Sequence, residues 1–299
     1  MTYVVEARWA GRILKEYLFS ELSLSRAQVV VLKKKEQGML LNGERVTVRA
    51  ILREGDLLEL ELEDEQSPED LIPYDYPLQI LYEDEDLILI NKPQGMPTHP
   101  SHGHFEDTLA NALACYYQKQ GRPFVFRAAN RLDRDTTGVV LVAKNKRASA
   151  ALSRQIMTRR VKKEYFALLQ GTLRDDEGCI DKNIVRALDS VILRSVSENE
   201  GERAFTTYRV LERRSGLTLV SAQPHTGRTH QLRVHFASIG HPIFGDGLYG
   251  TPSDRICGQA LHAFSLTFFH PISERELTVC APLHPEFCAL LKEYNFEFS

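Results

Sequence analysis

The densest group of chemically useful side chains lies in residues 130–138, which read Asn-Arg-Leu-Asp-Arg-Asp-Thr-Thr-Gly. Its two carboxylates, Asp133 and Asp135, alternate with arginines. Residues 139–143 follow as an apolar, largely β-branched run, which predicts a buried strand. Charges at the mouth of such a strand are costly to bury unless they are paired or used in a reaction. We therefore expect the chemistry of this protein at this segment.

Two enzyme classes match the letters of this segment in part. Asp135-Thr-Thr-Gly approximates the Asp-Thr-Gly of aspartic proteases, but it has an inserted residue and no second copy with which to share a proton. Asp133-x-Asp135-x-Thr137 matches the D-x-D-x-T of magnesium-dependent haloacid-dehalogenase phosphatases. In that family the apolar strand precedes the first aspartate, whereas here it follows, and no clear downstream acidic pair would hold the metal. The phosphatase stays as an alternative.

A third interpretation covers much more of the chain. Arg131-Leu-Asp133 through Gly138, followed by a strand, resembles the signature of the RluA-type pseudouridine synthases. Further motifs of that family match in order between residues 78 and 282: the strand and loop of residues 87–95, Lys163-Glu-Tyr165, residues 225–235, residues 241–246 and residues 261–263. Several motifs in one order are far more specific than any single string.

The resemblance implies an isomerase that converts uridine in RNA to pseudouridine without a metal or an organic cofactor. Asp133 would be the carboxylate beside the sugar, acting at the anomeric carbon or as a base at its neighbour. Arg233 would be the cation that keeps this carboxylate ionised and in place. Tyr165 would support the base and could transfer a proton. Arg131 would fill the gap that the flipped uridine leaves in the RNA.

A basic stretch would then bind the RNA backbone. Residues 144–163 hold eight basic and no acidic residues, although the whole chain carries a net charge of −3. We expect substrate contacts from this stretch and from the motifs beside it, namely Asn130, Arg160, Lys162, Lys163 and Arg228. Asn130 departs from the family, which most often has histidine there. An amide can replace one donor of an imidazole but not its titration. Since the carboxylate Asp133 and its partner Arg233 are both present, we expect activity to survive. An RNA-binding protein that has lost catalysis is the alternative.

Other side chains near these motifs have structural interpretations. Asp135 is expected to brace the turn through its backbone, and His230 to be a structural hydrogen-bond donor. Three histidines in a Pro/Gly-rich loop have no cysteine nearby, so a loop near substrate is favoured over a metal site; they are His99, His102 and His104. Three phenylalanines are expected in the core: Phe264, Phe268 and Phe269.

The first sixty residues predict a small unit of their own. A helix over residues 13–22, a second helix capped by Ser25, an Asn-Gly hairpin in residues 38–46 and a strand within 52–62 follow from the pattern. This unit resembles the small RNA-binding domain named after a ribosomal small-subunit protein. The resemblance implies RNA contacts by Arg26, Lys33, Lys34 and Lys35. Ten basic and eleven acidic residues in 1–64 give a weaker positive charge than that family usually shows.

These signals predict three segments: a small domain in residues 1–64, a linker in 65–76 and a catalytic domain in 77–299. The resemblance to the RluA-type synthases implies that the catalytic domain is α+β, with a large mixed and mostly antiparallel sheet around a central cleft. Strands are expected over residues 78–82 and 87–91, and helices over 108–118 and 146–160. Short strands are expected from residue 164 onward.

Composition limits where such a protein works. No run of about eighteen apolar residues is present, so a membrane span is not expected. The first residues lack the pattern of a secretory signal. Five scattered cysteines without a C-x-x-C pair disfavour disulfides and zinc. We expect a cytoplasmic monomer that acts on ribosomal RNA, or on transfer RNA, with no obligate protein partner.

Overall fold

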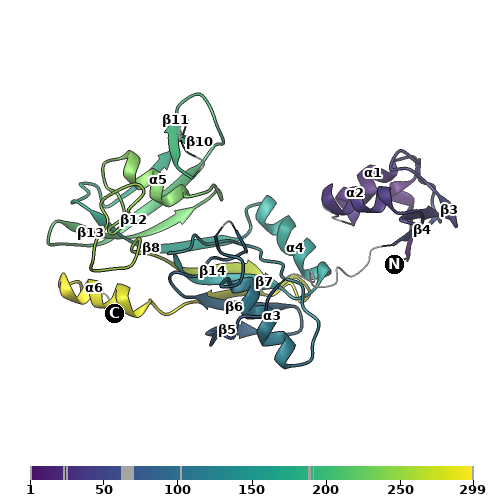
Figure 1. Ribbon diagram of the computed structural model, residues 1–299. Helices are drawn as coiled ribbons and strands as arrows, with labels where there is room; N and C mark the ends of the chain where they lie inside the picture. The colour runs from purple at the N-terminus through teal and green to yellow at the C-terminus, as the bar shows by residue number, and fades with distance from the viewer. Residues whose placement is uncertain are drawn as a thin grey trace. The chain divides into compact units, whose positions relative to one another are not determined.

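The computed structural model describes residues 2–22, 24, 26–61, 71–101, 103–187, 190 and 192–297, with side chains omitted for residues 26–28. The chain divides into two compact units, Met1–Pro68 and Glu69–Ser299 (Figure 1). This division falls inside the segment where the sequence predicts a linker. Residues 65–70 of that segment lie outside the described residues.

The first unit packs short helices on a four-stranded antiparallel sheet with the order β1-β4-β2-β3. Its apolar core includes Trp9, Leu18 and Leu52. The expected hairpin is confirmed, since Asn42 and Gly43 have φ angles of 56° and 80°, as the tight turn between two strands requires. The expected cap Ser25 lies outside the described residues. The elements are β1 (Thr2–Val4), η1 (Ala7–Trp9), α1 (Leu14–Glu16), η2 (Tyr17–Glu21), α2 (Arg26–Lys34), β2 (Met39–Leu41), β3 (Glu44–Arg45) and β4 (Leu57–Leu60).

The second unit is built on a nine-stranded sheet (Figure 1). Its order is β5-β6-β7-β14-β8-β13-β12-β9, with β15 also paired to β14. Among the described strands β7 and β14 are parallel and the other pairs of this sheet are antiparallel, which confirms the mixed, mostly antiparallel α+β fold. The strands are β5 (Ile80–Glu83), β6 (Leu87–Lys92), β7 (Thr137–Ala143), β8 (Lys162–Gln170), β9 (Glu177–Asp181), β12 (Phe205–Arg214), β13 (Leu217–Pro224), β14 (Leu261–Phe269) and β15 (Glu276–Cys280).

The sheet divides where β7 meets β14. The two strands pair only through Thr137 with His262 and Gly138 with Ala263, and β15 takes over this edge of β14 from Ser265 onward. A Cβ on Gly138 would lie 2.2 Å from the Ala263 carbonyl oxygen, and the φ of Gly138 is +109°. Glycine is therefore required here. The residues just before this junction are those in which the sequence predicts the chemistry.

Helices and one hairpin complete this unit: α3 (Leu109–Lys119), α4 (Lys146–Met157), α5 (Gln231–Ser238), α6 (Pro285–Glu293), β10 (Asn183–Arg186) and β11 (Arg194–Ser197). The predicted strands at residues 78–82 and 87–91 and the helices at 108–118 and 146–160 are confirmed within a few residues. Thr108 and Asn111 form a capping box on α3, and the Asn145 side chain caps α4.

The expectation that short strands dominate after residue 164 misses α5 and α6. Residues 231–236 of α5 are all buried, polar and apolar alike, so this helix has no apolar stripe for a periodicity argument to find. The missed helix matters for the predicted site, because Arg233 lies on α5.

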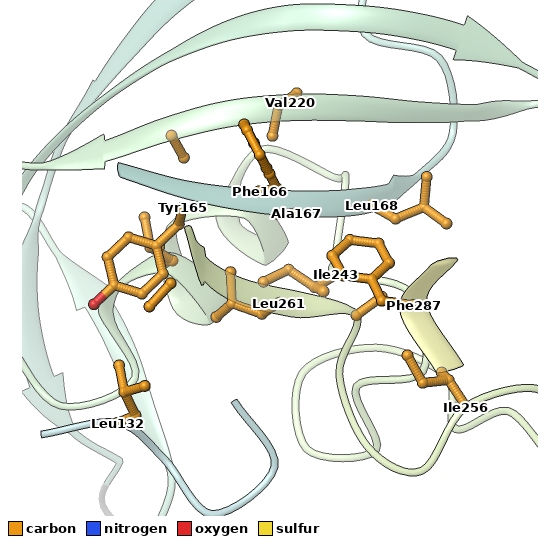
Figure 2. Packing of buried hydrophobic residues seen from close by; sticks show 14 of the residues in the cluster. Leu132, Tyr165, Phe166, Ala167, Leu168, Val220, Ile243, Ile256, Leu261 and Phe287 are labelled. Atoms are coloured by element: carbon orange, nitrogen blue, oxygen red, sulfur yellow. The ribbon is translucent and has the colours of Figure 1, made fainter. Parts of the chain in front are cut away.

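The main core of this unit lies between the sheet, α3 and α6 and reaches the cleft at Tyr165. In Figure 2, Leu132 and Leu261 lie near the Tyr165 ring, while its hydroxyl points away from the rest of the cluster. No described helix has the length and apolar character needed to cross a membrane.

Candidate active site

A cleft of about 650 Å³ opens beside the junction of β7 and β14. The loop before β7, strand β8, the loop after β13 and helix α5 all contribute to its walls. The ionisable side chains that line it include Arg131, Asp133, Lys163, Tyr165, His230 and Arg233. Parts of the chain about a hundred residues apart thus meet at one place.

Asp133 lies in a tight turn that is fixed from outside. The Thr136 N–H donates to the Asp133 carbonyl at 3.1 Å and closes the turn. The Thr98 hydroxyl bonds both the N–H and the carbonyl of Leu132, at 3.2 and 2.9 Å. Gln259 donates to the Thr136 hydroxyl at 2.9 Å. The loop therefore presents the Asp133 side chain in one orientation.

Asn130 lines the cleft and also supports this loop. Its side-chain amide donates to the Val139 carbonyl at 3.0 Å, and its oxygen accepts from the Leu141 N–H at 2.8 Å. Asn130 is buried, with 7% exposure, so bracing the loop against β7 is the role that its hydrogen bonds show. Such a role needs one donor and one acceptor, so its lack of titration is no handicap here. A contact of Asn130 with substrate stays a prediction.

A buried lysine supports the same loop. Lys92 at the end of β6 is fully buried, and its ammonium donates to the carbonyls of Pro93, Met96 and Arg134 at 2.7–2.8 Å. Burial lowers the pKa of Lys92 to about 7, while the negative charges of Asp135 and Asp133 act in the opposite direction. Three carbonyl acceptors match the three donors of an ammonium group. The lysine joins the loop after β6 to the turn of Asp133.

Arg233 joins Asp133 to a second carboxylate. Its Nη1 lies 3.2 Å from Asp133 Oδ2, while Nε and Nη2 donate to the two oxygens of Asp246 at 2.7 Å each. Burial lowers the pKa of Arg233, but its bonds to Asp246 and Asp133 outweigh burial and raise it. The bidentate pair fixes the plane of the guanidinium, so the direction of its remaining donor is fixed as well. Asp246 is the last residue of the motif at residues 241–246, and the sequence alone indicated no role for it.

Tyr165 stands beside this pair on β8. Its side chain is 9% exposed. Burial first, and the charge of Asp133 second, raise the pKa of Tyr165 above its ordinary value. The hydroxyl is therefore neutral at physiological pH and can donate a hydrogen bond.

The remaining predicted substrate contacts divide into two groups. Arg131 is exposed at the cleft, and Lys163 lines it without a hydrogen bond or ion pair among the described residues. Burial lowers the pKa of Lys163. Arg228 lines the cleft too, but it donates to Glu202 at 2.7 Å and to the Arg203 carbonyl at 3.1 Å.

The other basic residues lie away from the cleft lining. Lys162 is exposed, and Arg160 stacks over the Phe269 ring at 4.4 Å. Lys144 is held by Glu83 at 2.9 Å and by the Asp84 carbonyl, so the start of the basic stretch is structural.

The structure corrects one neighbouring interpretation and extends another. Asp135 does not bond the backbone of its turn among the described residues; its carboxylate pairs with the Arg134 guanidinium through two contacts of 3.0 Å. His230 has a structural hydrogen bond, with the Tyr249 hydroxyl at 2.8 Å, and it also lines the cleft, with Nε2 4.0 Å from Asp133 Oδ2.

The histidine loop is held by other contacts. His99 packs edge-on against Phe126, His104 bonds Asp107 at 2.7 Å, and His102 lies outside the described residues. The three phenylalanines were expected in the core. Phe268 is buried and Phe264 stacks on Phe166, whereas the ring of Phe269 contacts the Arg160 guanidinium.

The comparisons with known proteins agree with this geometry. The profile of the family described as RNA pseudouridylate synthase matches residues 86–238, which include Asp133, Tyr165 and Arg233. The chain belongs to this family. A Bacillus subtilis protein named as an uncharacterized RNA pseudouridine synthase, YjbO, is 39% identical over 94% of this chain and 99% of its own length.

Further similarities place the chain among the RluA-type synthases. Ribosomal large subunit pseudouridine synthase D of Nitrosomonas europaea is 42% identical over 72% of this chain and 65% of its own length. The structure of human RNA pseudouridylate synthase domain containing 1 superposes with a TM-score of 0.60 at 30% identity, covering 70% of this chain and 85% of that one. This protein is therefore an RNA pseudouridine synthase, an isomerase.

Proposed function

We propose that this synthase isomerises uridines of ribosomal RNA and that Asp133 is its catalytic carboxylate. The observation that supports this most is the oxygen asymmetry of Asp133. Asp133 lines the cleft, its Oδ2 faces Arg233 at 3.2 Å, and its Oδ1 has no hydrogen bond from the described residues. Because the hydrogen bond engages only one oxygen of the carboxylate, the other oxygen can interact with the sugar of the substrate.

The reaction breaks the bond from N1 of the base to the anomeric carbon and forms a bond from C5 to that carbon. The C5 proton leaves and N1 gains a proton, so no oxidant, metal or organic cofactor is needed. Asp133 acts at the anomeric carbon or as a base at its neighbour, and Arg233 balances its charge. Tyr165 supports the flipped base with its ring.

RNA contacts surround this centre. Arg131 at the exposed rim fills the place of the flipped base, and Lys163 meets a phosphate. In the first unit Lys33 and Lys34 are exposed, beside a groove that Arg45 and Arg49 also line. Lys35 lies 3.5 Å from Glu61, and the Arg26 side chain lies outside the described residues. This unit adds a second, weaker RNA contact.

The choice of ribosomal RNA rests on the relative named for the large ribosomal subunit, and transfer RNA is the second candidate. The synthase works as a monomer in the cytoplasm, where both RNAs are found. The test incubates the protein with transcripts of ribosomal and transfer RNA that carry tritium at C5 of uridine. Release of label from ribosomal RNA is expected.

Pseudouridine mapping in cells with and without the protein then identifies the position. Release of label from transfer RNA alone would show that transfer RNA, and not ribosomal RNA, is the substrate. Binding without release from either RNA would contradict the catalytic role.

A further inference from the structure

His230 has a left-handed backbone conformation, which determines where its side chain points. It precedes α5 with φ 57° and ψ 20°, in the left-handed region that is disfavoured for residues with a Cβ. Its imidazole lines the cleft, and Nε2 lies 4.0 Å from Asp133 Oδ2. A disfavoured conformation beside a catalytic group suggests that the orientation serves the reaction.

Tyr249 fixes the tautomer of this imidazole. The Tyr249 hydroxyl accepts from the Arg194 N–H at 2.9 Å and lies 2.8 Å from His230 Nδ1. If Nδ1 carried the proton, the hydroxyl would receive two donors and its own proton would have no acceptor among the described residues. The hydroxyl therefore donates to Nδ1, and the imidazole proton sits on Nε2, which faces Asp133.

The same contacts reach the β10–β11 hairpin, which lies beside α5 (Figure 1). Arg194 begins β11, and a small apolar cluster joins the hairpin to α5. Its members are Ile184, Ala204 and Val234, with Val196 and Tyr249 packed against them. A continuous set of contacts thus runs from the hairpin through Tyr249 and His230 to the carboxylate.

We propose that His230 is a positioning residue for Asp133, aimed by Tyr249 and through it dependent on the hairpin. The proposal rests on the proposed catalytic role of Asp133. Arg233 and the Nε2–H of His230 approach the same oxygen, Oδ2, so together they fix the rotation of the carboxylate and leave Oδ1 to the sugar. A separation of 4.0 Å is long for a hydrogen bond, and such contacts commonly shorten when substrate fills the site.

The test compares variants in single-turnover tritium release from the transcript that the wild-type protein modifies, with RNA affinity measured in parallel. His230→Ala should lower the rate about ten- to a hundredfold, the range for loss of a hydrogen bond to a charged group, and leave RNA affinity unchanged. His230→Gln, whose amide can reach the place of Nε2, should restore the rate to within about threefold. If His230→Ala does not fold, His230→Asn replaces it, since asparagine tolerates the left-handed backbone but ends short of Asp133.

Tyr249→Phe separates the two steps of the relay. It should lower the rate by less than His230→Ala, and the double variant should be no slower than His230→Ala alone. The matched control is His225→Ala, which removes an exposed imidazole from the same loop outside the cleft lining and should keep the wild-type rate.

A wild-type rate in His230→Ala, a loss confined to RNA affinity, failure of glutamine to restore the rate, or losses that multiply in the double variant would each overturn the relay. Asp133→Asn in the same assay distinguishes the two proposals. If Asp133→Asn is inactive while His230→Ala is fast, this inference alone fails. If Asp133→Asn turns over, the proposed function fails first.

Discussion

Two aspartates, Asp84 and Asp133, occupy similar turns before strands of the same sheet but differ in what their oxygens contact. Asp84 Oδ1 accepts two backbone N–H groups at 2.8 Å, and Oδ2 accepts from Tyr82 at 2.6 Å and His270 at 2.8 Å. Asp133 has one such contact, from Arg233 at 3.2 Å. A carboxylate whose oxygens are all engaged holds the fold, whereas one with an open oxygen at a cleft can react.

The surroundings of Asp84 also argue against a metal there, although Asp86 and His270 bring possible ligand atoms within 4.8 Å. His270 Nδ1 accepts two backbone N–H groups, so its Nε2 carries a proton and donates to Asp84. Burial alone would raise the pKa of Asp84, but the hydrogen bonds from Tyr82, the backbone and His270 have the larger effect, so the pKa is lowered. The oxygens of Asp84 and the nitrogens of His270 are thus already engaged in hydrogen bonds.

Asp133→Asn tests the reactive side of this comparison most strongly. The substitution removes the charge beside the sugar but keeps the shape of the side chain. We expect tritium release to fall at least about a thousandfold, since the reaction loses its nucleophile or base, with the melting temperature within about 3 °C of wild type. Turnover within tenfold of wild type would contradict the role of Asp133.

Arg233→Ala removes the hydrogen bond from the guanidinium to Asp133 Oδ2. It also leaves Asp246, which is fully buried, without its partner. We expect loss of turnover and a fall of about 3–5 kcal/mol in the free energy of unfolding, measured with urea. Arg203→Ala is the control: its pair with Asp181 is solvent-exposed, so stability should change little. Equal stability of the two variants would contradict a stabilising role of the buried pair between Arg233 and Asp246.

His262 provides a pH test of the contacts that support the turn of Asp133. Its Nε2 donates to the Ala281 carbonyl, so its Nδ1 accepts from the Thr137 hydroxyl, and burial lowers the pKa of His262 to about 4 from 6.5. Between these values the unfolded chain binds a proton that the folded protein does not. Stability therefore falls as the pH drops from 6.5 to 4, by about 3 kcal/mol from this residue.

Urea unfolding at pH 7, 5.5 and 4.5 measures this effect in the wild type and in His262→Gln. The variant should be less stable at pH 7 but should lose less on acidification. Parallel pH curves for the two proteins would assign the acid sensitivity to other groups.

Asp84→Asn tests the structural side of the comparison and should have the smallest effect. The substitution replaces one carboxylate oxygen with an NH2 group. This NH2 group would face hydrogen-bond donors and could not accept from them, which should cost about 1–3 kcal/mol of stability. The rate of tritium release should stay at the wild-type value because the cluster lies outside the cleft lining. A large loss of turnover in a folded variant would show that the two aspartates are coupled.

Local patterns in the sequence predicted much of the fold. The strand after Gly138, the helix over residues 108–118 and the Asn-Gly hairpin each depend on neighbouring residues, and all three are present. The family motifs also selected Asp133 and Arg233, which the structure brings to 3.2 Å. Helix α5 was missed because its buried polar residues give no periodic signal.

The sequence by itself determined the family and the mixed α+β fold, and it singled out Asp133 as the candidate carboxylate, since motifs and local propensities are written in consecutive residues. The tertiary structure decided what each polar group contacts. Asn130 turned inward to β7, Asp135 paired with Arg134, and Asp246 and His230 joined the surroundings of Asp133. Such assignments depend on the packing of distant segments, because a polar side chain is defined by the donors and acceptors that folding brings to it.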